Sequence, residues 1–229
     1  MISPPSLTPD VAYLPPAEGA WAPVWLDDAM VVVDKPAGLL SVPGRGADRA
    51  DCMLSRVQKR WPEALVVHRL DMATSGLLVF ARTPAAQRAL SASFADRHSV
   101  KRYVAVLHGL VGPDEATIDL PLVTDWPRRP MQKVCQTDGK PSLTRLRVLA
   151  RDEVAGLTRV ELTPVTGRSH QLRVHTLALG HPIVGDPLYG PGPAPGASAE
   201  GRMLLHAEHL ALPHPSDGRL QSWNAPADF

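Results

Sequence analysis

The sequence predicts an α+β fold in which strands outnumber helices. Short apolar or alternating segments typical of strands recur along the chain, whereas only three segments carry apolar residues at helical spacing. The strands and helices do not alternate regularly, as they would in a doubly wound fold, so a mixed sheet is favoured.

The predicted strands are short runs bounded by turn residues. One run alternates, because Thr144, Leu146 and Val148 share one face while the arginines between them share the other. Strands are expected at residues 30–33, 65–67, 77–80, 103–107, 143–149 and 158–162.

The three predicted helices have apolar residues along one side and breaking residues at their ends. Pro62 stops the first helix, Pro84 occupies the first position of the second, and Gly180 closes the third. These helices are expected at residues 50–61, 84–94 and 168–179.

Length and composition are those of an ordinary globular protein. The chain has 229 residues, of which 44% are hydrophobic and 21% charged, and its formal net charge is +1. A surface for nucleic acid must therefore come from local clustering of Lys and Arg. We expect a flexible, proline-rich extension over residues 1–22, one catalytic domain over residues 23–229, and a flexible surface loop over residues 190–201.

Targeting and cysteine signals favour the cytoplasm. Cys52 and Cys135 belong to no Cys-x-x-Cys pair, which suits a reducing compartment while leaving one disulfide open. The first 16 residues lack a basic start followed by an apolar run, and no apolar stretch reaches membrane-spanning length. The expectation is a monomer without membrane contact.

The first polar cluster lies between two predicted strands. His68, Arg69 and Asp71 occupy this connection, where loops on a rigid sheet often carry catalytic groups. Asp71 or Thr74 could equally cap the turn through bonds to the backbone. From the local sequence alone, catalysis and turn capping are equally favoured.

Two further clusters carry candidate groups. Tyr103 lies on a strand and could stack on a base, although an isolated tyrosine is more often a core residue. Residues 166–175 crowd polar donors at a helix start, where His170 and Arg173 share one side and phosphate could bind. The His170–His175 spacing makes a zinc site an unfavoured interpretation.

These clusters, taken in order, resemble the RluA family of pseudouridine synthases over nearly the whole chain after about residue 22. The matching segments are VDKPAGLLSVPG (33–44), HRLDMATSGLL (68–78), KRYVA (101–105), TGRSHQLRVHTLALGHPIVGDPLYG (166–190) and LLHA (204–207). The resemblance implies a central mixed, mainly antiparallel sheet flanked by helices and loops. It also implies an active-site cleft across the sheet and no separate RNA-binding domain.

The resemblance also implies the roles of individual residues. Asp71 matches the catalytic aspartate, and Arg173 matches the arginine that pairs with the aspartate. Tyr103 matches the active-site tyrosine, which packs on the uracil and is implicated in proton removal. Arg69 matches a residue able to fill the space of a flipped base. The expected contacts with the substrate RNA come from His68, Arg69, Thr74, Arg168, His170 and Gln171.

The implied reaction isomerises uridine to pseudouridine, with neither metal nor cofactor. The implied substrates are stem-loops of tRNA, at position 32 of the anticodon loop, and of 23S rRNA, at position 746, where flipping a base costs least. Three alternatives stay open: a family member with another rRNA target, a glycosidic hydrolase, and a non-catalytic RNA-binding module. A hydrolase of the carboxylate-pair type would need a second acid near Asp71.

Overall fold

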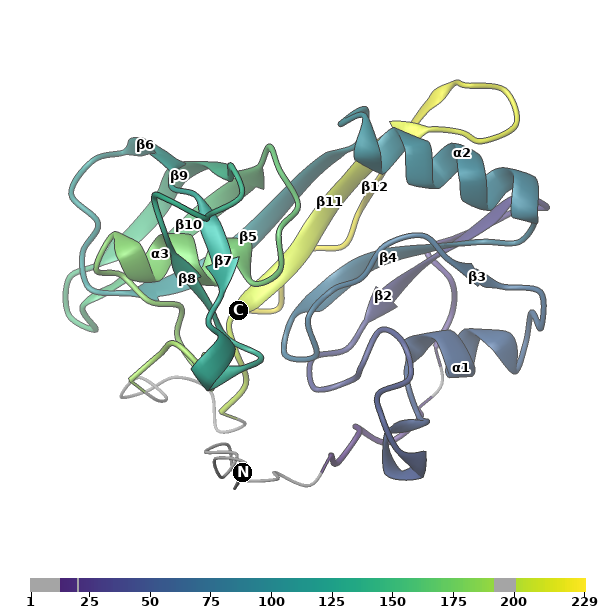
Figure 1. Ribbon diagram of the computed structural model, residues 1–229, viewed down its shortest axis with the longest axis horizontal. Helices are drawn as coiled ribbons and strands as arrows, with labels where there is room; N and C mark the ends of the chain where they lie inside the picture. Colours follow the sequence, from purple (N-terminus) through teal and green to yellow (C-terminus); the bar gives the residue numbers. More distant parts are fainter. Residues whose placement is uncertain (1–12, 20, 192–200) are drawn as a thin grey trace.

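One large twisted sheet organises the computed structural model, which describes residues 13–19, 21–191 and 201–229 (Figure 1). Within these ranges ten strands join in the order β1-β2-β4-β11-β5-β10-β9-β6, with β12 beside β11 and β3 beside β4. The strands are β1 Trp25–Leu26, β2 Met30–Lys35, β3 Leu65–Val66, β4 Ser75–Ala81, β5 Val100–His108, β6 Glu115–Asp119, β9 Leu143–Asp152, β10 Leu157–Pro164, β11 Leu205–Pro213 and β12 Leu220–Asn224.

The predicted α+β class with a mixed, mainly antiparallel sheet is confirmed. The sheet is mixed because β4 and β11 pair in parallel, whereas its other pairs are antiparallel. The β4–β11 pairing joins two halves of the sheet through Ser75 with His206 and Gly76 with Ala207. Gly76 has φ +113°, and a Cβ there would lie 2.5 Å from backbone atoms of Ala207, so only glycine fits.

The first half of the sheet is covered on both faces. Met30 and Val32 of β2 pack in a cluster with α2, Pro84–Ala95, while Val31 and Val33 pack in a cluster with α1, Met53–Gln58. This alternation explains the continuous apolar run of β2, because a strand buried on both faces has no solvent side.

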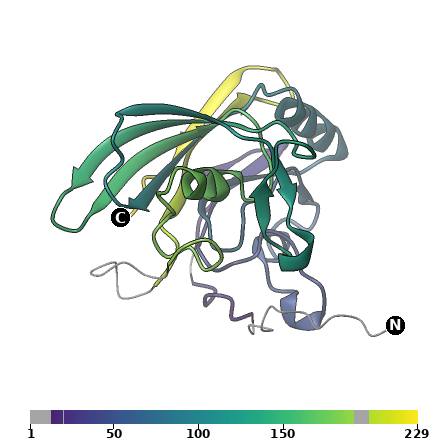
Figure 2. The same cartoon turned by 60° about the vertical axis from the view of Figure 1, so that its left-hand side comes forward.

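The second half carries the remaining helix and a small hairpin. Helix α3, Gln171–Ala178, lies under the arched strands β5, β10 and β9, where Leu172 packs with Ala105 and Leu162 (Figure 2). The separate hairpin of β7, Leu122–Thr124, and β8, Gln132–Val134, packs next to α3, with Val174 and Leu122 in one apolar cluster.

Two helix starts differ from the predictions. Helix α1 begins at Met53, because Cys52 and Ser55 form a reciprocal capping box that sets the first turn. Helix α3 begins only at Gln171, because His170 has a left-handed backbone with φ 54°. Arg168 and His170 therefore lie on the approach to the helix and not within it.

Part of the expected flexible extension is anchored to the body. The Tyr13 hydroxyl donates to the carbonyl of Asp51 at 2.9 Å and accepts from the amide of Leu40 at 3.0 Å. Arg56 donates to the carbonyl of Pro16 at 2.6 Å. The remainder of that expectation, residues 1–12 and 20, lies outside the described residues, as do residues 192–200 of the expected 190–201 loop. No helix in the described part of the chain is long and apolar enough to span a membrane.

Candidate active site

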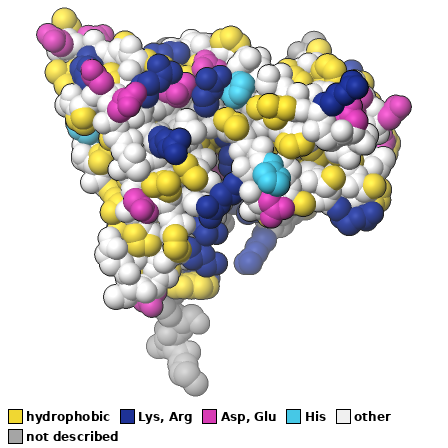
Figure 3. Space-filling view, turned by 90° about the horizontal axis from the view of Figure 1, so that it is seen from above, with side chains coloured by type: hydrophobic (Ala, Val, Ile, Leu, Met, Phe, Trp, Pro, Cys, Tyr) yellow, Lys and Arg dark blue, Asp and Glu magenta, His cyan; other side chains and the backbone are white. Residues whose placement is uncertain are grey.

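A basic cleft lies between the two halves of the sheet. The cavity has a volume of about 1840 Å³, and its described lining contains one acidic residue, Asp71. The cations that line it are Arg45, Arg49, Arg69, Arg97, Lys101, Arg128, Arg129, Arg168 and Arg173. Figure 3 shows Lys and Arg side chains gathered along a hollow between two parts of the surface. The nearly neutral chain thus concentrates positive charge where a polyanion could bind.

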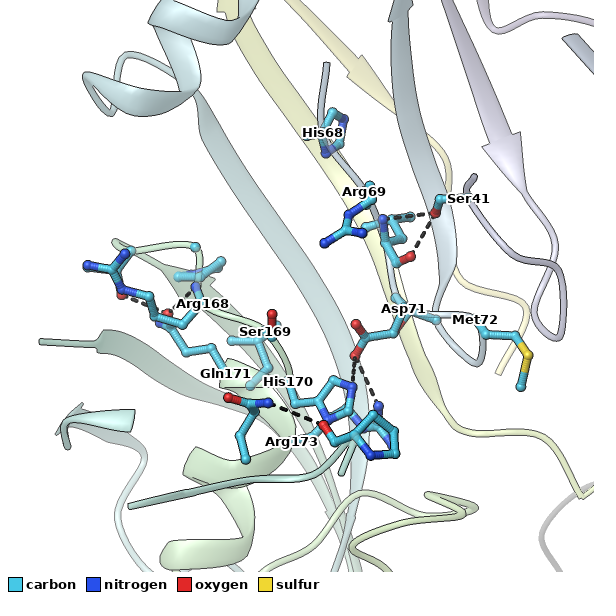
Figure 4. Close-up of a pocket in the computed structure, with 18 of the residues that line it drawn as sticks. Ser41, His68, Arg69, Asp71, Met72, Arg168, Ser169, His170, Gln171 and Arg173 are labelled. Carbon is cyan, nitrogen blue, oxygen red and sulfur yellow. Dashed lines mark hydrogen bonds and ion pairs between the residues drawn. The ribbon is translucent and has the colours of Figure 1, made fainter. Parts of the chain in front are cut away.

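The loop that carries Asp71 is fixed on both sides of the aspartate. The Ser41 hydroxyl donates to the carbonyl of Leu70 at 2.7 Å and accepts from the Leu70 amide at 3.0 Å. The Lys35 ammonium donates to the carbonyl of Met72 at 3.2 Å. The carboxylate reaches from this loop toward α3, with its side chain 29% exposed (Figure 4).

Lys35 is a buried residue at the end of β2, and in the sequence analysis it stood only within the matching segment 33–44. Its amino group also donates to the carbonyls of Leu39 and Pro36, at 2.7 and 2.9 Å. Burial lowers the pKa of Lys35 to about 7, while the negative charges of Asp71 and Asp34 oppose that shift. Lys35 therefore ties the loop to β2, and in its protonated form its charge acts on Asp71.

Arg173 joins Asp71 to a second, deeper carboxylate. Its Nη1 donates to Oδ2 of Asp71 at 3.0 Å, while Nε and Nη2 donate to Asp186 at 2.7 Å each. Burial raises the pKa of Asp186, but the Arg173 hydrogen bonds and charge outweigh burial and hold this pKa below its ordinary value. The Asp71–Arg173 pair was expected from the family resemblance. A role for Asp186 was not expected, although Asp186 lies within the matching segment 166–190.

Tyr103 lines the cleft from β5. Its ring packs against apolar clusters of both halves, and its hydroxyl makes no hydrogen bond with another described residue. Burial raises the pKa of Tyr103, and the charge of Asp71 adds to this effect. The phenol therefore stays protonated at neutral pH and offers an apolar face with a free hydroxyl.

His170 approaches Asp71 from the turn before α3. Its Nε2 lies 3.9 Å from Oδ2 of Asp71, and its Nδ1 lies 2.8 Å from the hydroxyl of Tyr189. Tyr189 also places its ring under the Arg173 guanidinium, 5.0 Å from the ring centre. Asp71, His170, Arg173 and Tyr189 therefore form one connected group, of which the sequence analysis missed Tyr189.

The expected RNA contacts divide into two groups. Arg69 and Arg168 are exposed and line the cleft. Gln171 and Thr74 are buried, although both also line the cleft. The side chain of Gln171 is bonded to Thr166, Leu143 and Thr144, and RNA contact by these two residues stays a prediction.

His68 also has an internal role. Its ring stacks on Phe94 at 4.4 Å, and its Nε2 accepts from the backbone amide of Val79 at 3.2 Å. Burial lowers the pKa of His68 to about 3, with a smaller contribution from the charge of Lys101. The ring is therefore neutral at physiological pH and presents its edge, not a charge, to the cleft.

The β7–β8 hairpin carries several cations around a buried aspartate. Asp125 is buried and holds Arg128 through a 2.6 Å ion pair, while Lys133 lies 3.7 Å from the same carboxylate. Arg129 lies over the exposed ring of Trp126, 4.7 Å from its centre. This mixture of aromatic and guanidinium groups at the cleft edge suits single-stranded nucleic acid.

Comparison with known proteins gives consistent matches across the chain. Residues 29–178 match the family described as RNA pseudouridylate synthase. The chain is 51% identical over 219 residues to the dual-specificity RNA pseudouridine synthase RluA of Escherichia coli K12, covering 95% of this chain and 98% of the relative. It is 48% identical to the protein of the same name from Yersinia pestis, covering 90% and 98%.

A solved structure shares both fold and sequence with this chain. Human RNA pseudouridylate synthase domain containing 1 superposes with a TM-score of 0.75 at 31% identity, covering 94% of this chain and 87% of the other. Human RNA pseudouridylate synthase domain containing 4 superposes with a TM-score of 0.68 at 24% identity, covering 89% of this chain and 87% of the other, which shows a shared fold.

Proposed function

The chain belongs to the RNA pseudouridylate synthase family, and from this premise we propose that Asp71, Tyr103 and Arg173 are its catalytic residues. The protein is an isomerase that converts uridine in RNA to pseudouridine. The observation that carries the residue assignment is the Asp71–Arg173 pair, which lies in a cleft otherwise lined by cations.

The reaction conserves all atoms of the nucleotide. The N1–C1′ bond breaks, the uracil turns, a C5–C1′ bond forms, and the proton on C5 moves to N1 through exchange with solvent. Asp71 can act by attack at C1′, by attack at C6, or by assisting elimination at the sugar, and each route needs the ionised carboxylate. The Arg173 guanidinium at 3.0 Å favours that ionised form.

Tyr103 is proposed to pack on the detached uracil. Its apolar ring and free hydroxyl face the same cleft as Asp71, and stacking would hold the base while it turns. The raised pKa of the phenol, caused by burial and then by Asp71, opposes a phenolate as the base that removes the C5 proton. Relay of the C5 proton through the neutral Tyr103 hydroxyl agrees better with the raised pKa than removal by a phenolate does.

Access to the uridine requires that the base leave its stack. Exposed Arg69, two residues before Asp71, is proposed to fill the space that the flipped base leaves. Unstacking costs a few kcal/mol and is least costly in loops, which favours stem-loop substrates. The cations of the cleft and of the hairpin tip would contact the flanking phosphates.

The substrates are proposed to be the anticodon loop of tRNA and a stem-loop of 23S rRNA. The support is the dual specificity in the names of relatives that share about half of their residues with this chain over nearly their full length. We also propose a single catalytic domain over residues 23–229, which acts in the cytoplasm as a monomer. The support for the single domain is that one sheet runs through both halves and that both halves line the cleft.

A glycosidic hydrolase fits the site less well. The second carboxylate that such an enzyme needs could only be Asp186 among the neighbours of Asp71, and Asp186 is 1% exposed and bonded to Arg173. It therefore cannot reach a sugar in the cleft. The geometry favours one reactive carboxylate, as isomerisation requires.

Tritium release tests the proposal directly. RNA that contains C5-tritiated uridine, incubated with the protein, should lose tritium to water while the chain stays intact. Release of free uracil, or abasic sites in the RNA, would show hydrolysis instead. Pseudouridine mapping of tRNA and rRNA from cells with and without the protein then tests the proposed substrates.

A further inference from the structure

The hydroxyl of Tyr189 lies between the backbone amide of Gln132 and the ring of His170. The Gln132 amide donates to this hydroxyl at 2.7 Å, so the hydroxyl is an acceptor in that bond. The hydroxyl's own proton can then be donated to Nδ1 of His170, 2.8 Å away. In that arrangement a neutral His170 carries its proton on Nε2, the nitrogen that lies 3.9 Å from Asp71.

His170 is neutral in this environment. The charged groups around its ring are Asp71, Arg173 and Asp186, and Tyr189 is the remaining titratable neighbour. Burial lowers the pKa of His170, Asp71 and Asp186 oppose this shift, and Arg173 adds to it. The lowered pKa keeps the imidazole uncharged at neutral pH, where its tautomer matters.

Both donors around Asp71 approach the same oxygen. Arg173 donates to Oδ2 at 3.0 Å, and Nε2 of His170 lies 3.9 Å from that oxygen, which is longer than a hydrogen bond. Such contacts tighten when substrate closes a site. Oδ1 has no donor among the described residues and stays available on the cleft side.

The backbone of His170 supports a special role. A φ of 54° is uncommon for a residue other than glycine, and it directs the imidazole back toward the cleft just before α3. Residues held in such conformations concentrate at functional sites, where surrounding contacts maintain them.

We propose that His170 and Tyr189 are positioning residues that direct an Nε2 proton to Oδ2 of Asp71 and so reserve Oδ1 for the substrate. This inference rests on the proposed role of Asp71 in pseudouridine formation. Because the hydroxyl that faces His170 also holds the amide of Gln132 in β8, one hydrogen-bonded chain runs from the hairpin to His170, whose Nε2 lies 3.9 Å from Asp71. His170 thus acts on Asp71 and not on the RNA.

The tautomer can be observed without any assay of activity. Long-range ¹H–¹⁵N spectra of protein labelled at histidine, with His170→Asn providing the assignment, should show His170 protonated on Nε2 at neutral pH. In Tyr189→Phe the same ring should shift toward a mixture of tautomers, because Nδ1 has lost its donor. A wild-type ring protonated on Nδ1 would overturn the proposal.

Kinetics separate positioning from RNA binding. His170→Asn keeps a side chain that tolerates the left-handed backbone and can accept from Tyr189, but it cannot reach Asp71 with a donor. Its single-turnover rate should fall by about 10- to 100-fold, the usual effect of losing a group that orients a reactive side chain, while its RNA affinity stays unchanged. Weaker RNA binding with an unchanged rate would instead make His170 an RNA contact and refute the inference.

A double variant gives the most discriminating result. Tyr189→Phe retains the ring under Arg173 but loses the hydroxyl, so it should lower the rate in the same step as His170→Asn. The double variant should be no slower than His170→Asn alone, because both changes break one chain. Additive losses would refute the shared chain.

His209→Asn is the matched control, because His209 bonds Asn224 and does not line the cleft, and it should keep the wild-type rate. Wild-type protein that releases no tritium would refute the proposed function itself. That outcome is distinct from an active wild type whose His170 and Tyr189 variants behave like this control.

Discussion

Arg173 is bound more extensively to Asp186 than to Asp71. Two hydrogen bonds of 2.7 Å join Arg173 to the buried carboxylate of Asp186, whereas one of 3.0 Å joins it to Asp71. Asp186 also accepts the amides of Leu188 and Tyr189. The buried carboxylate of Asp186 thus fixes the orientation of the Arg173 guanidinium. The remaining nitrogen of Arg173, Nη1, then points to the carboxylate of Asp71.

Asp186→Asn should therefore damage both the fold and the rate. Removing one charge of a buried, hydrogen-bonded pair should lower the free energy of unfolding by about 3 kcal/mol. Arg173 would lose its fixed orientation, and the single-turnover rate should fall with it. Urea unfolding and tritium release measure the two effects, and an Asp186→Asn protein of wild-type stability would contradict this account of Asp186.

Arg173→Lys should lose most of the activity despite its retained charge. An ammonium cannot donate to Asp186 twice and to Asp71 once in the planar geometry of the guanidinium fork. We expect the rate to fall by at least about 100-fold, with a smaller loss of RNA affinity. Full turnover by this variant would remove Arg173 from the mechanism.

Asp71→Asn should abolish product formation and preserve RNA binding. The amide is nearly the same size but is neither nucleophile nor base, so the rate should fall by at least about three orders of magnitude. The side chain is partly exposed, so stability should change little. Gel-shift titration with a substrate stem-loop provides the binding control, and residual turnover near wild type would contradict the proposed role.

Ser41→Ala should release the loop that carries Asp71. It removes two hydrogen bonds to Leu70, which should lower the free energy of unfolding by about 1–3 kcal/mol and slow the reaction. Ser93→Ala is a matched control, because the buried Ser93 hydroxyl has no hydrogen-bond partner among the described residues and its removal should not destabilise the protein. Equal effects of the two changes would refute the importance of the Ser41 bonds.

His68 should make the fold sensitive to acid. Its folded-state pKa is lowered by burial to about 3, so below its unfolded pKa near 6.5 only the unfolded chain takes up the proton. This contribution to stability is complete above pH 6.5 and is lost as pH falls toward 3, by at most about 1.4 kcal/mol per pH unit. His68→Phe should remove that dependence.

Urea unfolding of both proteins at pH 7.5, 6 and 5 measures this effect. The phenylalanine ring keeps the stacking on Phe94 but leaves the Val79 amide without its acceptor, so the variant should start less stable. The difference in the free energy of unfolding between the wild type and His68→Phe should become smaller as the pH falls. Parallel profiles for the two proteins would contradict a buried neutral His68.

The sequence predicted best what depends on local pattern or on ordered motifs. The run of β2 and the helix α2 followed from apolar spacing and from Pro84. The placement of Asp71 beside Arg173 came from the family resemblance, since 102 residues separate them along the chain. Strand β11 was missed because its segment carries two histidines and a glutamate, and the partners of those side chains lie on distant strands.

Features that depend on distant partners were not predictable. The burial of Lys35 was not predicted, because the carbonyls of Leu39 and Met72 that allow it meet Lys35 only in the folded chain. Tyr189 gave no local signal, because its function depends on Gln132 and His170. The predicted strand ended at residue 33 and the predicted helix began at residue 168, whereas β2 ends at Lys35 and α3 begins at Gln171. Both differences have the same origin.

The bond between Tyr189 and the hairpin has a consequence for competition between RNAs. An RNA that fills the basic cleft but displaces the β7–β8 hairpin would break the Gln132–Tyr189 bond, and with it the chain that leads toward Asp71. Such an RNA would act as an inhibitor and not as a slow substrate. Cellular RNAs would then differ in their turnover rates and in their residence times on the protein. The rates at which the protein first binds them would differ little.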